Sequence, residues 1–212
     1  VVKNLSVIHQ ANHYFPVLLG LEGGRLIQGS LERLSDLAGK GIKYLTLTHN
    51  RNTSWADSAT DTENLGGLSS FGIEVVKKCN DLKVLVDVSH ASDFTARDAI
   101  QASVKPVIAS HSGCRNLVRQ PRNLPDWLIR EIANTGGIVC VPYVKKFLGH
   151  YTIAEHVSYI ADLVGVKHVG IGGMALGGWG QGSLAGSRDA GVRASDALER
   201  IVGMLKEAKS KE

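Results

Sequence analysis

A short apolar run followed by a longer amphipathic segment recurs along most of the chain, and this alternation restricts the fold more than any other feature. Six such runs cover residues 16–21, 42–48, 83–88, 106–110, 137–141 and 167–171. Runs of about five apolar residues without strict alternation are typical of strands buried on both faces, as in parallel sheets. The sequence therefore predicts six strands joined by longer connections.

The segments between these runs carry apolar residues at helical spacing. Helices are expected over residues 30–38, 68–79, 92–102 and 153–164, and from Pro125 onward. Ser30 is a suitable N-cap for the first of them. The alternation predicts an α/β fold. Six strand–helix units fit either an open doubly wound sheet or most of a (β/α)8 barrel, and the pattern leaves both open.

The composition argues against several classes of partner. Lys and Arg number 24 and Asp and Glu 20, a net charge of +4, and the aromatic content is 6%. The basic residues are dispersed, whereas nucleic-acid-binding proteins gather them on one face. No apolar run reaches the ~18 residues of a membrane span. We therefore expect neither a nucleic-acid partner nor a membrane span.

The cysteines and glycines bear on compartment and cofactor. Cys79, Cys114 and Cys140 form no C-x-x-C pair and no disulfide framework, and no export signal is recognisable, so a cytoplasmic location is the default expectation. No G-x-G-x-x-G follows the first run and no Walker A sequence occurs. The glycines of residues 170–173 look like a nucleotide-binding turn, but a single glycine cluster is weak evidence for one. A nucleotide-binding domain therefore has little support.

Four successive apolar runs are each followed by a residue that can bind a metal. Glu22 follows the first run, His49 the second, His90 the third and His111 the fourth. In both α/β architectures the carboxyl ends of the strands face a common site. A single His at a strand end is more often a capping or packing residue, but four ligands in succession favour a metal site. Two or three imidazoles with a carboxylate are a donor set for catalytic zinc.

Six short segments in this order resemble the membrane (renal) dipeptidase family, which are zinc peptidases with a metal-dependent barrel related to the amidohydrolases. The segments are Leu19–Glu22 with Gly23 and Gly24, Tyr44–Asn50, Trp55–Ser58, Val86–His90, Pro106–Ser112 and Arg122–Asp126. Their order and spacing agree with the family over about residues 15–172. The resemblance implies an incomplete (β/α)8 TIM-type barrel of about six βα units, and a metallopeptidase that hydrolyses dipeptides with a metal-activated water.

The resemblance also implies roles for individual residues. Glu22 resembles the carboxylate that bridges two zinc ions, and His90 and His111 resemble the imidazoles of the second zinc. His49 resembles the histidine that contacts the substrate and the tetrahedral intermediate. Arg122 resembles the residue that binds the substrate carboxylate, for which a guanidinium fork is suited.

Two of the residues in these segments have simpler interpretations. Arg122 is alternatively a surface ion-pair residue. Asp57, within the Trp55–Ser58 segment, is expected to cap a turn.

Two departures from the family pattern affect the expected activity. The family begins with a strand ending in His-x-Asp, which supplies ligands of the first zinc, but neither His9 nor His13 is followed by Asp at that spacing. After the sixth strand the family has an Asp that handles the proton of the attacking water, and Met174 stands there instead. The similarity ends where a Gly-rich stretch begins, as a reading-frame change would produce.

These features define the expected organisation. Residues 1–172 are expected to form a partial dipeptidase-like barrel, residues 173–195 a Gly-rich loop or linker, and residues 196–212 a helix with a charged tail. Six strands of an eight-stranded barrel leave two open edges. Either residues 1–14, a second copy or a strand-completing partner covers these edges, or the chain is only marginally stable.

Two functional hypotheses follow. The first is a zinc dipeptidase with one retained site at Glu22, His90 and His111, whose substrate is a dipeptide or similar small amide and which is weakly active or inactive as the chain stands. The alternative is a non-catalytic, truncated dipeptidase-like protein that keeps one metal site and binds a partner through its open barrel edges.

Overall fold

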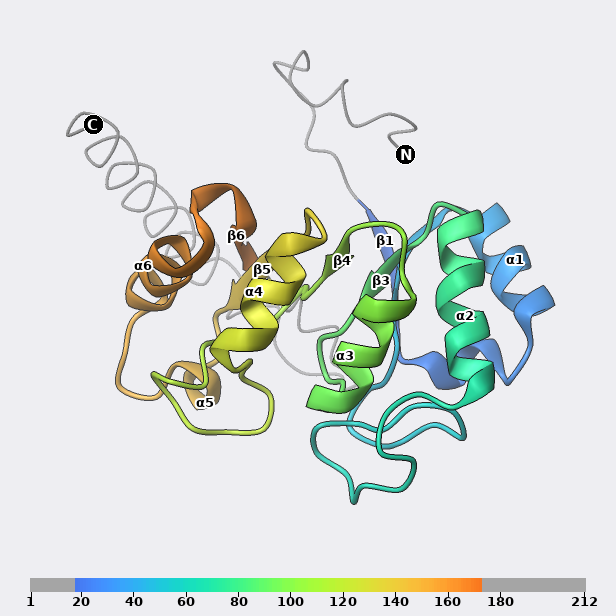
Figure 1. Ribbon diagram of the computed structural model, residues 1–212, viewed down its shortest axis with the longest axis horizontal. Coiled ribbons are helices and arrows are strands. Elements are labelled where there is room, and N and C mark those ends of the chain that lie inside the picture. The colour runs from blue at the N-terminus through green and yellow to red at the C-terminus, as the bar shows by residue number, and fades with distance from the viewer. Residues whose placement is uncertain (1–17, 173–212) are drawn as a thin grey trace, which may run out of the picture.

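The structure, a computed structural model, describes residues 18–172 (Figure 1). Within this range the strands are β1 (Leu19–Glu22), β2 (Ile42–Thr46), β3 (Leu85–Asp87), β4 (Val107–Ile108), β5 (Val139–Pro142) and β6 (Val169–Gly172). The α-helices are α1 (Leu31–Gly39), α2 (Ser70–Asp81), α3 (Asp93–Ala102), α4 (Asp126–Asn134), α5 (Lys145–Leu148) and α6 (Ile153–Val164). Two 3-10 helices are η2 (Gly24–Ile27) and η3 (Val166–His168). The predicted α/β class is confirmed.

The strands are parallel and follow one another in chain order. One sheet has the order β1-β2-β3-β4 and a second the order β5-β6, and a single parallel bridge between Ala109 and Val139 joins them. A doubly wound sheet reverses its strand order at a switch point, and no reversal occurs among the described strands. The arrangement is that of consecutive units of a (β/α)8 barrel.

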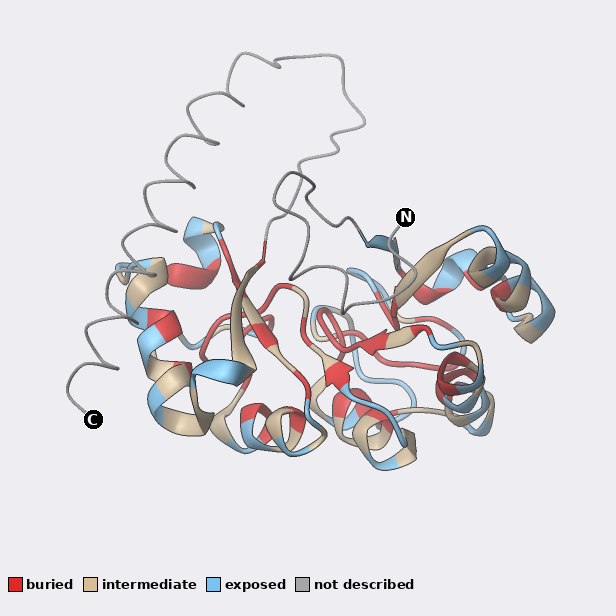
Figure 2. Ribbon diagram, turned by 90° about the horizontal axis from the view of Figure 1, so that it is seen from above, coloured by how far each residue is buried: buried red, intermediate tan, exposed pale blue. Residues whose placement is uncertain are grey.

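The helices lie along the outer side of the curved row of strands (Figures 1 and 2). Neighbouring helices contact one another in the order α1, α2, α3, α4, α6. Each turns a buried apolar face toward the strands, through Leu34, Val75, Val76, Ala96, Ala99, Ile129, Ile132 and Ile160. Burying one such side chain of Val or Leu size stabilises the fold by about 1.5–3 kcal/mol.

Polar side chains cap the first turns of α1, α2, α3 and α6. The Ser30 hydroxyl accepts a hydrogen bond from the backbone N–H of Arg33, which confirms the predicted N-cap. Ser69 and Ser92 cap α2 and α3 in the same way. Thr152 starts α6 with a capping box, in which its partner is the Glu155 carboxylate. These caps fix where each connection ends and each helix starts.

The observed strands are shorter than the predicted ones. β2, β3 and β4 end before the predicted carboxyl ends, whereas β1, β5 and β6 start two or three residues later than predicted and end one residue later. The backbone N–H of Leu47 still donates to the backbone carbonyl of Asp87 at 3.1 Å, and that of Val88 to the carbonyl of Ile108 at 2.9 Å. The regular pairing of the strands has already ended at these residues. The residues beyond these bonds begin the loops that carry the histidines. The short helix α5 was not predicted.

Both ends of the strand row have a free edge within the described residues. There β1 pairs only with β2, and β6 pairs only with β5. Leu18 and Leu19, beside the β1 edge, are 40% and 46% exposed. Residues 1–14, the Gly-rich stretch, Met174 and the predicted C-terminal helix all lie outside the described residues.

Within the part of the chain that the structure describes, no helix is both long enough and apolar enough to cross a bilayer. The three cysteines are free thiols, as expected.

Candidate metal centre

Glu22 is the last residue of β1 and stands at the carboxyl edge of the sheet. The next residue, Gly23, adopts φ 107°, a conformation that favours glycine. The backbone N–H groups of Gly23 and Gly24 donate to the carbonyls of Thr46 and Leu47, at 3.1 and 3.2 Å. The turn after Glu22 is thereby held against β2, and the carboxylate stays near the other strand ends.

His90 follows β3 in a strained backbone conformation. Its φ is 70°, in the left-handed region, where a residue with a Cβ atom pays about 1–2 kcal/mol. Its carbonyl accepts a hydrogen bond of 2.8 Å from the Ala59 N–H, which holds the conformation. Strain of this kind is concentrated at functional sites. The conformation aims a ring that is only 7% exposed at Glu22.

His111 follows β4 and is held by hydroxyl groups. Its backbone N–H donates to Ser89 Oγ at 2.9 Å, and its ring Nδ1 lies 2.8 Å from Ser110 Oγ. The residue is 6% exposed. These contacts leave Nε2 as the ring atom that faces Glu22 and His90.

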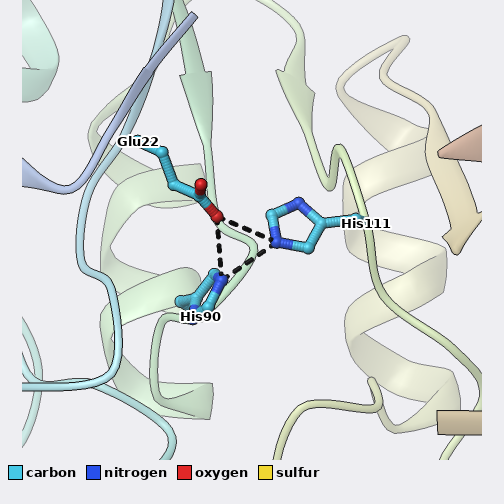
Figure 3. A group of neighbouring side chains, drawn as sticks. All are labelled: Glu22, His90 and His111. Atoms are coloured by element: carbon cyan, nitrogen blue, oxygen red, sulfur yellow. Dashed lines mark hydrogen bonds and ion pairs between the residues drawn. The ribbon is translucent and has the colours of Figure 1, made fainter. Parts of the chain in front are cut away.

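The three side chains meet at one point (Figure 3). Glu22 Oε1 lies 3.1 Å from His90 Nε2 and 3.2 Å from His111 Nε2, and the two Nε2 atoms are 2.9 Å apart. They are the one group of three or more potential metal ligands found among residues 18–172. In a tetrahedral zinc site with bonds of about 2.1 Å, ligand atoms lie about 3.4 Å apart. The observed spacings are within a few tenths of an ångström, so the cluster fits a metal ion.

The electrostatics of the cluster favour the protonation states that bind metals. The close contacts of its carboxylate with the rings of His111 and His90 hold the pKa of Glu22 far below its ordinary value. Burial lowers the pKa of His90 to about 4. A metal site needs an ionised carboxylate and neutral imidazoles. Glu22 and His90 therefore have these states at neutral pH without a metal.

His49 lies beside the cluster and faces solvent. Its Nε2 is 3.9 Å from Glu22 Oε1, and its ring centroid is 4.5 Å from that of His90. Its side chain is 52% exposed. A histidine in this position can reach a molecule bound at the cluster.

Arg122 is buried, so the interpretation as a surface ion-pair residue is wrong. It is 5% exposed, and its three guanidinium nitrogens have no hydrogen-bond partner among the described residues. Its guanidinium carbon lies 5.0 Å from the centroid of the Phe147 ring. Burial lowers the pKa of Arg122 to about 10, and its charge in turn lowers the pKa of His90. A buried cation without an acceptor beside the cluster is suited to an anionic ligand.

Two of the site's structural supports were not anticipated. Asp87 and Ser110, both within segments that resemble the family, form a partly buried hydrogen-bond network behind His111. Phe147, in the unpredicted helix α5, packs on Arg122. The one feature of the sequence that could have indicated this network is Asp87 itself, a charged residue between two valines of a predicted buried strand.

Asp57 has the role that we expected. Its Oδ2 accepts the backbone N–H groups of residues 64–66 at 3.2, 2.8 and 2.8 Å, and so it closes the turn that precedes α2.

The fold and the cluster together define a parallel α/β protein with metal ligands at the carboxyl ends of its strands. A comparison with protein families agrees: the family "Membrane dipeptidase (Peptidase family M19)" matches residues 1–186. The chain therefore belongs to the membrane dipeptidase family. This match extends beyond residues 15–172, the range over which the sequence segments resemble the family.

Individual relatives support this assignment. Dipeptidase 3 of Mus musculus is 37% identical over 167 residues, which are 74% of this chain and 34% of the relative. An amidohydrolase structure from Pseudomonas aeruginosa matches with a TM-score of 0.72 and 29% identity, over 77% of this chain and 52% of that one.

A metallopeptidase from Rhodobacter sphaeroides, liganded with a phosphinate mimic of the dipeptide L-Ala-D-Ala, matches with a TM-score of 0.68 and 25% identity. That match covers 74% of this chain and 49% of the other. This chain spans about a third to two fifths of the length of the curated relatives.

Proposed function

We propose that the chain is a zinc-dependent hydrolase of the dipeptidase type, with one zinc site formed by Glu22, His90 and His111. The donor set of two imidazoles and one carboxylate, with its 2.9–3.2 Å spacing, supports zinc. A bound zinc ion would supply Lewis-acid polarisation of the scissile carbonyl and a lowered pKa for a bound water.

The observation that carries the substrate class is the unpartnered guanidinium of Arg122. A dipeptide has a free carboxylate within two residues of its scissile bond, and a guanidinium binds a carboxylate through two parallel hydrogen bonds. Arg122 would hold that carboxylate, and Phe147 would keep the guanidinium plane in place. The peptide bond would then lie over the cluster.

His49 would act on the other side of the bound peptide. Its half-exposed ring, 3.9 Å from Glu22, is free to donate a hydrogen bond to the oxygen on which negative charge develops. Turnover by this chain alone is proposed to be weak or absent. Met174 stands where the family pattern has the proton-handling Asp, and such a group typically contributes ~10²–10⁴-fold.

Binding tests the substrate class even where turnover is absent. Zinc-loaded protein should bind a phosphinate mimic of L-Ala-D-Ala in isothermal titration calorimetry, and the same compound with its carboxylate amidated should bind at least tenfold more weakly. R122M should remove this preference without changing zinc affinity. The matched control is R119M, an exposed arginine of the same loop. Equal affinity for both compounds would refute the assignment of Arg122.

The second candidate, a non-catalytic metal-binding protein with a partner at its sheet edges, is supported by the exposed Leu18 and Leu19 beside β1. A monomer in light scattering that binds the phosphinate mimic favours the dipeptidase proposal. A dimer that dissociates when Leu19 becomes Lys, and that binds no mimic, favours the alternative.

A further inference from the structure

The strongest structural feature outside the ligands themselves is a buried carboxylate behind His111. Asp87, the last residue of β3, is 0% exposed. Its Oδ1 accepts the backbone N–H groups of Ser89 and Ser110, at 3.0 and 2.9 Å. Its Oδ2 lies 2.6 Å from the hydroxyl of Thr46 and 2.6 Å from that of Ser110. The carboxylate thus joins β2, β3 and the chain after β4.

The directions of these hydrogen bonds follow from the chemistry of the groups. Backbone N–H groups only donate, so they fix the role of Oδ1. An ionised carboxylate only accepts, so both hydroxyls give their hydrogen to Oδ2. Ser110 Oγ also lies 3.4 Å from Ser89 Oγ, but the 2.6 Å contact with the carboxylate is much the stronger. The single hydrogen of Ser110 is therefore used on Asp87.

This assignment determines the tautomer of His111. Ser110 Oγ lies 2.8 Å from His111 Nδ1, and with its hydrogen on Asp87 it can only accept there. Nδ1 of His111 must then carry the ring hydrogen, and Nε2 presents a lone pair to Glu22 and His90. That is the tautomer in which Nε2 can bind a metal.

The second histidine is not held in this way. Nδ1 of His90 is buried and has no hydrogen-bond partner among the described residues. With a lone pair on His111 Nε2 and a carboxylate at Glu22, the three facing atoms share one hydrogen at most, from His90. A cation would replace that hydrogen, and His90 is free to move it to Nδ1.

We propose that Asp87 and Ser110 are positioning residues that fix His111 in its metal-binding tautomer before the metal arrives. The proposal deepens the proposed function and rests on the zinc site described there. The carboxylate acts through the serine hydroxyl, so neither residue touches the metal or the substrate. Loss of such outer partners typically weakens metal binding 10–100-fold.

The substitution D87N distinguishes this role from a merely structural one. The two backbone N–H groups would still require the amide oxygen at the position of Oδ1, so the NH₂ group would face the hydroxyls. Ser110 would then accept from the amide and donate its own hydrogen to His111 Nδ1. His111 would switch to the tautomer with hydrogen on Nε2, which must give up that hydrogen before Nε2 can bind a metal.

The experiment compares D87N, S110A, S110T and the control T46V, which removes the other hydroxyl from the same carboxylate oxygen but leaves Ser110 and His111 untouched. Nitrogen-15 NMR of the imidazoles in zinc-free protein reports the tautomer, with H111N to assign the signals. The wild type, S110T and T46V should show hydrogen on Nδ1 of His111. D87N should show it on Nε2, and S110A should show a mixture.

Zinc affinity is the second readout. D87N and S110A should raise the zinc dissociation constant about 10–100-fold, whereas S110T and T46V should stay near the wild type. S110A removes only one half-buried oxygen, so it can test the proposal if D87N does not fold. An unchanged His111 tautomer in both D87N and S110A would overturn the inference. So would a loss of zinc affinity in T46V equal to that in S110A. A wild type with hydrogen on Nδ1 that binds no zinc would instead refute the metal site and leave the tautomer assignment standing.

Discussion

The guanidinium of Arg122 lies over the ring of Phe147, 5.0 Å from its centroid, at a point where no described side chain offers it an acceptor. The ring belongs to α5, a helix of four residues that follows β5. An arginine on an aromatic face keeps its N–H groups in one plane and available at the edge. The contact thus holds a buried cation ready for an anion without neutralising it.

Removing this ring should weaken binding of the anionic ligand. F147L should lower the affinity for the phosphinate dipeptide mimic by about two- to thirtyfold, the range of a cation–π contact. Zinc affinity should not change. F94L is a matched control, because Arg97 lies over Phe94 at the same 5.0 Å but outside the cluster. Calorimetry with the zinc-loaded proteins measures the affinity of F147L and of F94L for the mimic. Equal affinities of F147L and wild type for the mimic would contradict the account.

The left-handed backbone of His90 makes a second prediction. In zinc-free protein H90G should be more stable than H90A by about 1 kcal/mol, because glycine adopts φ 70° without strain. At Ala91, outside the left-handed region, the order should reverse, with A91G less stable than the wild type. Urea unfolding measures the four proteins. A higher stability of H90A than of H90G would show that His90 is unstrained.

The three hydrogen bonds of Asp57 should contribute measurably to stability. D57A leaves three backbone N–H groups without their acceptor and should lower the free energy of unfolding by about 1–3 kcal/mol. D57N keeps a neutral acceptor and should lose less. Zinc affinity should be the same in both, since the turn does not touch the cluster. A loss below about 0.5 kcal/mol in D57A would place the stabilising bonds elsewhere.

His156 should make the protein sensitive to acid. It is 0% exposed, accepts the Cys114 N–H at 3.0 Å, and burial lowers its pKa. The unfolded chain takes up this proton below about pH 6.5 while the folded protein does not, so stability is lost as pH falls through that value.

Uptake of this one proton changes the free energy of unfolding by at most about 1.4 kcal/mol per pH unit. The stability difference between metal-free wild type and H156Q should therefore shrink between pH 7.5 and 5. H150Q, at an exposed histidine, is the control. A difference that stays constant with pH would assign the acid sensitivity to other groups.

Much of this site could be predicted because strand ends in a parallel sheet converge. Glu22, His90 and His111 each follow an apolar run. Their convergence at the strand ends can be predicted without knowing how the side chains pack. The N-cap at Ser30 was equally accessible, because it depends on residues three positions apart. The sequential strand order, by contrast, needed the structure, since both α/β architectures share the same pattern.

The supports of the site could not be predicted for physical reasons. Asp87 and Ser110 lie within predicted strands, and only the register of β3 on β4 decides whether they meet. Arg122 and Phe147 are brought together by packing rather than by local sequence. Burial of Arg122 is likewise a tertiary property, and a charged residue in a loop segment is exposed by default.

Zinc stoichiometry tests the central claim most directly. Metal-free protein is dialysed against buffered zinc, and the metal per chain is measured by mass spectrometry for the wild type, H111A and R122M. The account predicts one zinc per chain in the wild type and R122M and none in H111A. Zinc retained by H111A, or none in the folded wild type, would contradict the assignment of Glu22, His90 and His111 as the metal site.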